Sequence, residues 1–165
     1  MQRVFSASIL ATCLLAAATA VRAQDCSNLS NWDLRGTYSM SGQGWMDLSK
    51  LIPGAPSGTV PFAWVGSHVW DGAGGGSGWV SVNAGGLQLT VQFVGLTYAV
   101  KADCSLIVSF AMTAKEMPGL KIGPVTRVLV IAGKSEPLEL FMTFLGGGPG
   151  MPVDVGVSRR ISMQY

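Results

Sequence analysis

The chain has 165 residues, with 11 basic and 9 acidic side chains, 22 glycines and 48% hydrophobic residues. This length suits one domain with a buried core. The charges are few and form no basic face or charge run, which argues against a nucleic-acid partner and against an anionic membrane surface. Abundant glycine and little charge are typical of a barrel or sandwich with many turns rather than a helical bundle.

Residues 1–23 are typical of a secretory signal peptide. A short positive start precedes the apolar run 4–20, and Val21-Arg22-Ala23 places small residues at positions −3 and −1 of a cleavage site. We expect cleavage to leave residues 24–165 as a single β-barrel domain that carries 9 basic and 9 acidic side chains. An uncleaved anchor is the alternative, but the apolar run is short for a membrane span. The sequence therefore predicts a secreted or periplasmic protein with no stable membrane span after cleavage.

Cleavage would remove Cys13 and leave Cys26 and Cys104. Because exported proteins meet an oxidising environment, we expect these two cysteines to form a disulfide. One or two free reactive thiols are the alternative, although no His or Arg lies near either cysteine in sequence to activate it.

Eight segments have the alternation and β-branched content of strands. They are 34–42, 62–71, 78–83, 87–101, 104–113, 125–132, 138–145 and 153–164. Segments 45–57, 114–124 and 146–152 are predicted as longer loops. Closing eight meandering strands into one antiparallel, mostly up-and-down barrel would remove their exposed edges, so we predict an all-β, eight-stranded barrel. A two-sheet β-sandwich is the alternative.

The hairpin 61–83 is the strongest element of the prediction. It holds three of the five tryptophans and the single histidine, with a glycine turn that starts at Asp71. Phe62, Trp64, His68 and Trp70 share one strand face because side chains alternate with period two. These large aromatic side chains gain more from burial than the small residues of the opposite face, so we predict that they point inward.

Three segments resemble a group of small secreted bacterial proteins of unassigned function. They read LRGTY at 34–38, FAWVG at 62–66 leading to DGAG at 71–74, and TYAVKADCS at 97–105. That group is similar to the calycins and to allene oxide cyclase, which implies an eight-stranded barrel. The resemblance covers residues 34–105. No segment matches the catalytic residues of allene oxide cyclase or the Gly-x-Trp opening of lipocalins, so no functional residue is carried over.

The candidate ligand-binding residues are those that could line an open end of the barrel. Aromatic and methionine side chains offer an adaptable apolar surface, His68 adds an imidazole, and an inward arginine would need a partner such as Glu139 or a ligand carboxylate. The alternatives are a His68 that points outward or is satisfied within the core, and an Arg159-Arg160 pair that marks a strand leaving the core into water. The candidates are Tyr38, Met40, Trp64, His68, Trp70, Arg127 and Arg159. No metal site or cofactor is predicted: one histidine cannot complete a zinc site, and the glycine run 72–78 lacks the Lys and following helix of a phosphate loop.

Three functions remain open. The first is a non-enzymatic barrel that binds a small apolar or aromatic molecule. The second is a cofactor-independent isomerase or cyclase in the same cavity, with His68, Tyr38 and an arginine as acid, base and charge groups. The third is a structural or interaction protein of the cell envelope whose interior is filled by side chains. The sequence does not indicate the oligomeric state.

Overall fold

The protein is an all-β barrel in a computed structural model that describes residues 26–55, 57–132, 138–144 and 153–163. Its strands are β1 Gly36–Asp47, β2 Thr59–Trp70, β3 Gly75–Ala84, β4 Leu87–Val100, β5 Ser105–Ala114, β6 Met117–Ile131, β7 Glu139–Phe144 and β8 Val153–Ser162. Two 3-10 helices lie outside the strands, η1 at Asn31–Leu34 and η2 at Leu48–Lys50. The predicted signal peptide and the predicted loop 146–152 lie outside the described residues.

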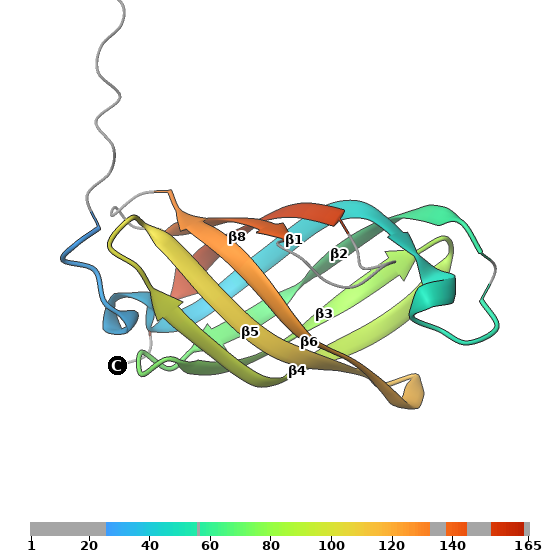
Figure 1. The fold of residues 1–165 in the computed structure, drawn as a ribbon. Coiled ribbons are helices and arrows are strands. Elements are labelled where there is room, and N and C mark those ends of the chain that lie inside the picture. The colour runs from blue at the N-terminus through green and yellow to red at the C-terminus, as the bar shows by residue number, and fades with distance from the viewer. Residues whose placement is uncertain (1–25, 56, 133–137, 145–152, 164–165) are drawn as a thin grey trace, which may run out of the picture.

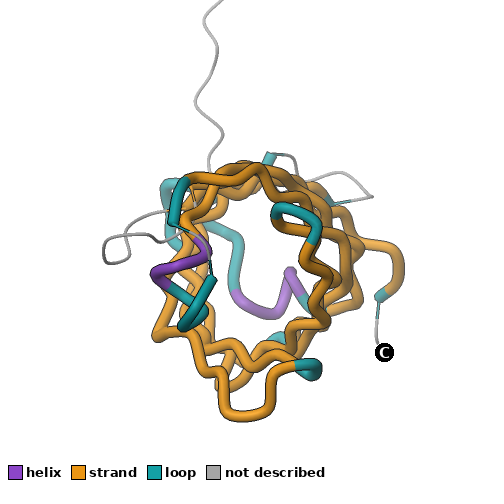
Figure 2. The backbone as a smooth tube through the Cα atoms, turned by 90° about the vertical axis from the view of Figure 1, so that its right-hand side faces the viewer, coloured by secondary structure: helices purple, strands orange, loops and turns teal. Residues whose placement is uncertain are grey.

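Each strand pairs antiparallel with the next, and β8 returns to pair with β1, so the barrel is closed. Figure 2 looks along the barrel and shows the complete ring of strands. Closure leaves every strand with a neighbour on both sides, which removes the exposed edges that a sandwich would keep. The predicted eight-stranded, up-and-down barrel is confirmed, and the sandwich alternative is wrong.

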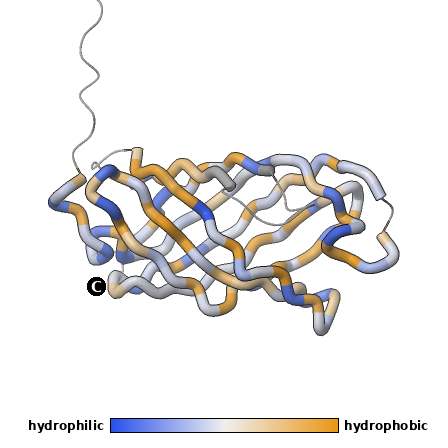
Figure 3. Tube along the Cα trace, in the orientation of Figure 1, coloured by the Kyte–Doolittle hydropathy of each residue, from blue (hydrophilic) through white to orange (hydrophobic). Residues whose placement is uncertain are grey.

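Burial follows the period-two alternation of the strands, and hydrophobic and hydrophilic residues alternate along the chain in Figure 3. On β2, the side chains of Phe62, Trp64, His68 and Trp70 are all buried, whereas Val65 on the opposite face is 59% exposed. The aromatic face of the central hairpin therefore points into the barrel, as predicted.

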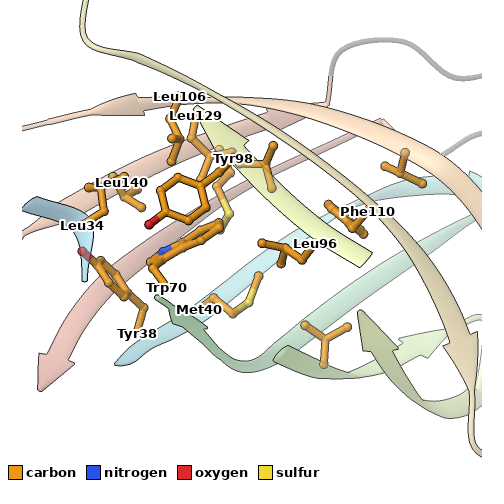
Figure 4. Close-up of a cluster of buried hydrophobic side chains, with 14 of the residues drawn as sticks. Leu34, Tyr38, Met40, Trp70, Leu96, Tyr98, Leu106, Phe110, Leu129 and Leu140 are labelled. Atoms are coloured by element: carbon orange, nitrogen blue, oxygen red, sulfur yellow. The ribbon is translucent and has the colours of Figure 1, made fainter. Parts of the chain in front are cut away.

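One end of the barrel is closed by the N-terminal segment. The Cys26–Cys104 disulfide ties this segment to the turn before β5, as predicted. The hydroxyl of Tyr98 accepts a hydrogen bond from the backbone N–H of Gly72 and donates one to the carbonyl of Asn31 in η1. Leu34 then packs against the buried cluster at this closed end (Figure 4). A disulfide fits an oxidising compartment outside the cytoplasm.

The strands at the opposite end are longer than predicted. β1 continues to Asp47, and β6 begins at Met117, within the predicted loop 114–124 and despite Pro118 and Pro124. Among the described residues, β7 pairs with β6 only over Arg127–Ile131, so the first part of β6 pairs with β5 alone. A strand bonded on one side tolerates proline, which lacks an N–H. The register of β4 with β5 shifts between Val94 and Thr97, around Gly95, which has a positive φ of 62°.

Candidate ligand-binding cavity

The interior of the barrel contains an apolar cavity of about 100 Å³. At the end away from η1, leucine and isoleucine side chains of the η2 segment form part of its wall. Toward the closed end, Trp70 forms its inner limit and packs edge-on against Tyr98, with ring centroids 4.6 Å apart. The lining includes Met40, Met46, Leu48, Leu51, Ile52, Phe62, Trp64, His68, Trp70, Val80, Leu96, Phe110, Arg127, Leu129 and Met142.

Trp64 lies flat on the inner wall of the barrel because two glycines leave room for it. Gly42 of β1 pairs with Trp64 on one side and with Gly156 of β8 on the other. A Cβ atom at Gly42 would come within 2.3 Å of the Trp64 ring, and one at Gly156 within 2.7 Å. Glycine at these two positions therefore leaves space across β1 through which the Trp64 indole reaches β8.

On the far side of β1, the Trp64 indole contacts a buried ion pair. Its Nε1 donates a hydrogen bond to Oδ2 of Asp154 at 3.0 Å, and Nη2 of Arg127 donates to the same oxygen at 2.8 Å. The guanidinium of Arg127 also lies 5.6 Å from the ring centroid of Trp64, within the range of a cation–π contact. Strands β2, β6 and β8 thus each contribute one side chain to a single polar cluster in an apolar lumen.

Only one of the two carboxylate oxygens of Asp154 has hydrogen-bond partners among the described residues. Its side chain is fully buried, and within the described ranges Oδ1 has no hydrogen-bond partner, although Oδ2 has two. A second hollow, of about 700 Å³ and open to solvent, also borders Asp154; Gln43, Trp45, Phe62 and Asn83 are among its other lining residues. Asp154 therefore borders the open hollow, and the two side chains that hold its Oδ2, Trp64 and Arg127, line the apolar cavity.

His68 is a neutral, buried imidazole. Its Nδ1 lies 3.1 Å from Sδ of Met40, and its Nε2 lies 3.2 Å from Oγ of Ser158. Burial lowers the pKa of His68 from 6.5 to about 3, because a charged imidazolium would lose its hydration there. With the proton on Nδ1, the ring donates to the Met40 sulfur and accepts from the Ser158 hydroxyl, so both ring nitrogens have partners.

Five of the seven predicted ligand-binding residues line the cavity: Met40, Trp64, His68, Trp70 and Arg127. The sequence predicted that His68 and Trp70 lie near an open end of the barrel. Both instead lie toward the closed end. Trp70 is the last residue of β2 and precedes the turn at the closed end, so the two side chains form the inner part of the cavity.

Two of the seven candidates, Tyr38 and Arg159, do not line the cavity. Tyr38 is buried beneath His68 and Trp70, with ring centroids 5.3 Å and 6.4 Å away, and does not reach the cavity. Arg159 points outward, with 59% of its side chain exposed, and pairs with Glu139 on the outer surface. The period of the strand places the neighbouring Arg160 inside instead. Nη1 of Arg160 donates to the carbonyls of Asp33 and Arg35 at the closed end.

Asp154 and Ser158 belong to the site but were not among the predicted residues. Both lie on the face of β8 that reads Asp, Gly, Ser, Arg, which looks like the solvent side beside the alternating valines of the other face. The available signal was Gly156 in the middle of that polar face, because a strand glycine marks the close approach of another group.

Among the residues that the structure describes, no group of three or more His, Cys, Asp or Glu side chains could hold a metal ion. The described part of the chain also has no helix long and apolar enough to cross a membrane. Comparison of the chain with protein-family models, with curated proteins and with solved structures gives no match. The resemblance to calycin-like barrels therefore stays a prediction.

Proposed function

We propose that this protein is an exported barrel that binds a small apolar or aromatic molecule in its lumen. The observation that carries the proposal is the cavity of about 100 Å³ inside a closed barrel, with apolar walls and one polar cluster. Ligand sites are commonly built in this way, with a mainly apolar surface for affinity and a few polar groups for orientation. Open volume also favours ligand binding over a purely structural role, because side chains would fill the interior of a purely structural barrel.

The size of the cavity limits the ligand. Sites for drug-sized molecules measure roughly 300–1,000 Å³, whereas an apolar cavity of about 150 Å³ holds one benzene molecule. A volume of about 100 Å³ suits a single small ring or a short alkyl chain. Met40, Met46 and Met142 line the cavity, and methionine side chains readily change rotamer to fit an irregular guest.

The protonation state of His68 favours a ligand-binding role for the cavity over a catalytic role in proton transfer. A general base works best when its pKa lies near the operating pH. Burial instead lowers the pKa of His68 to about 3, which makes the imidazole a weak base at neutral pH. Both ring nitrogens also contact neighbouring side chains, Met40 and Ser158, rather than the open volume.

Thermal unfolding of residues 24–165 with increasing toluene tests the proposal. Because toluene would bind the folded state alone, the melting midpoint should rise by several degrees once its concentration far exceeds the dissociation constant. Tryptophan emission should change over the same concentrations, since Trp64 and Trp70 line the cavity. An unchanged midpoint and emission across toluene, p-cresol and short alkanes would contradict ligand binding.

A matched pair of variants locates the binding event. Val80→Phe places a ring into the cavity, whereas Val65→Phe places the same ring on the outer face of the neighbouring strand, where the valine is 59% exposed. We expect the toluene effect to disappear in the first variant and to persist in the second, with cooperative unfolding in both. Equal responses in the two variants would mean that toluene binds elsewhere.

A further inference from the structure

We propose that the open hollow on the outer wall of the barrel binds a neutral saccharide. This ligand differs in chemistry from the one proposed for the lumen and binds at a separate surface, so the assignment goes beyond the proposed function. The hollow measures about 700 Å³, within the range of roughly 300–1,000 Å³ that is common for ligand sites. It lies over strands β8, β1, β2 and β3, which run side by side (Figure 1). The exposed residues of its lining are Gln43, Trp45, Pro61, Ala63, Asn83 and Val155.

The strand register gives the hollow an amide side and an aromatic side. Ala63 on β2 pairs with Gln43 on β1 and with Asn83 on β3, so these three outward residues form one row across the strands. Because neighbouring strands lie about 4.8 Å apart, the backbones that carry the two amides are about 10 Å apart. Trp45 lies in the next outward row of β1, and Gly44 between the rows has no side chain. An elongated ligand that crosses the strands between these rows would have the amides along one side and the indole along the other.

Trp45 offers a flat apolar surface for a sugar ring. The residue is 58% exposed, and its indole forms no hydrogen bond or ring contact within the described part of the chain. One face of a pyranose ring presents C–H groups, which are weakly positive and pack on the negative face of an aromatic ring. Stacking would also remove the exposed indole from water, which is favourable for so large an apolar group.

Gln43 and Asn83 offer polar groups that match the hydroxyls of a sugar. A side-chain amide donates through its N–H groups and accepts through its carbonyl oxygen, and a hydroxyl likewise donates and accepts. Both residues are exposed, and neither amide is hydrogen-bonded to another of the described residues. A saccharide would therefore bind these amides without breaking any contact that holds the barrel together.

The wall around the hollow carries almost no charge. Strands β1 to β4 contain one charged residue, Asp47, at the end of β1. Asp154 borders the hollow as well, but its side chain is fully buried and paired with Arg127. An ionised ligand would lose hydration here without gaining an opposite charge, whereas a wholly apolar ligand would leave the amides without partners. A neutral molecule with many hydroxyls avoids both costs.

Calorimetric titration of residues 24–165 with pentasaccharides tests the assignment. The neutral probes are cellopentaose, maltopentaose and chitopentaose, and the charged probe is pentagalacturonate, which carries a carboxylate on every ring. We expect at least one neutral probe to bind about tenfold more tightly than the galacturonate, because the site offers no cation to replace the lost hydration. If none of the neutral probes binds, or if the galacturonate binds as tightly as they do, the inference is overturned.

Two exposed tryptophans provide a matched pair of variants. Trp45→Ala should weaken binding of the neutral probe about tenfold, the loss expected for one aromatic contact, and Trp45→Phe should restore part of it because a ring remains. Trp79→Ala is the control, since Trp79 is 47% exposed on β3 but does not line the hollow. It should leave the affinity unchanged. Equal losses in the two alanine variants would place the sugar elsewhere on the wall and overturn the assignment.

The two amides are tested in the same way. Asn83→Ala removes one hydrogen-bonding partner from the hollow and should weaken binding severalfold. Gln92→Ala is the control, because Gln92 is an exposed amide on β4 that pairs with Trp79, away from the hollow. An Asn83→Ala variant that binds as well as the unmodified protein would contradict the role of the amide row.

Val80→Phe separates this site from the lumen. Filling the cavity should abolish toluene binding and leave saccharide binding unchanged, whereas Trp45→Ala should weaken saccharide binding and leave toluene binding unchanged. Saccharide binding that disappears in Val80→Phe would place the sugar in the lumen and overturn the inference. Absence of toluene binding in the unmodified protein would count against the proposed function alone, because the outer site shares no exposed residue with the cavity.

Discussion

Trp64 on β2 and Asp154 on β8 are joined by a buried hydrogen bond of 3.0 Å across the intervening strand β1. The bond connects positions 90 residues apart and exists because Gly42 and Gly156 have no side chains where the indole passes. It brings the second and the last strands of the barrel to one polar cluster, which Arg127 completes from β6. The cluster is therefore a product of barrel closure rather than of any local motif.

Removing one member of the ion pair should cost far more than removing both. Arg127→Met leaves the Asp154 carboxylate buried without its cation, and we expect the free energy of unfolding to fall by about 3–5 kcal/mol. Arg127→Met/Asp154→Leu replaces both charges by apolar groups and should be nearly neutral or stabilising, as for other buried pairs. Urea unfolding followed by tryptophan fluorescence measures both. A double variant less stable than the single one would contradict this account.

Gly42→Ala should destabilise the barrel. The new Cβ would lie 2.3 Å from the Trp64 ring and 2.6 Å from the backbone carbonyl of Val155, and the carbonyl cannot move without disturbing the pairing of β1 with β8. Overpacking of this kind typically costs about 1–3 kcal/mol. The control is Ser41→Ala on the exposed outer face of the same strand, which should unfold at the same urea concentration as the unmodified protein. A similar midpoint for both variants would show that the indole can lie elsewhere.

The sequence was sufficient to predict the barrel, the disulfide and the inward face of β2. Each depends on a signal within one segment or on composition: alternation, turn glycines, and the two cysteines that lie beyond the predicted signal peptide. The bulk of Phe62, Trp64 and Trp70 decided which face of β2 is buried, because area buried dominates the energy of such a choice. Arg127 lies on the same face of β6 as buried Val125 and Leu129, as the period of two requires.

On β8, the valine face has the composition of a buried face. Val155 is instead 61% exposed, while Asp154 and Ser158 are buried because they bond to Trp64 and His68 from β2. These partners lie 90 residues away in sequence and come together only when the barrel closes. Arg159 lies on the same exposed face as Val155. The candidate site could therefore be predicted from the sequence on β2, but its acidic member could not.

The disulfide should contribute substantially to stability. It joins Cys26 and Cys104 across a separation of 78 residues and fastens the segment that closes one end of the barrel. Loss of a native disulfide from a small exported domain costs about 2–5 kcal/mol. We expect Cys26→Ser/Cys104→Ser to lower the free energy of unfolding by that amount, while reductant added to this variant has no further effect. Intact-mass measurement of the secreted protein with a thiol reagent should show two thiols only after reduction. Free thiols before reduction would contradict the pairing.

Acid should weaken the fold through His68 before it acts on the carboxylates. Burial lowers the pKa of His68 from 6.5 to about 3 in the folded state. Between these values the unfolded chain binds a proton that the folded chain does not, so stability is complete above pH 6.5 and is lost as the pH falls. The slope is about 1.4 kcal/mol per pH unit, which gives a loss of roughly 2 kcal/mol between pH 7.5 and pH 5.

His68→Leu removes the titrating group and keeps an apolar side chain of similar size inside the barrel. Its stability at pH 7.5 should be lower, because Ser158 loses its partner at Nε2, but that stability should stay nearly constant down to pH 5. The carboxyls of Asp33 and Asp71 have a lowered pKa from backbone hydrogen bonds, so their protonation weakens the fold only at more acidic pH, in both proteins. Urea midpoints for the two proteins at pH 7.5, 6 and 5 isolate the histidine contribution. Parallel losses in both would show that His68 is protonated, or exposed to solvent, in the folded barrel.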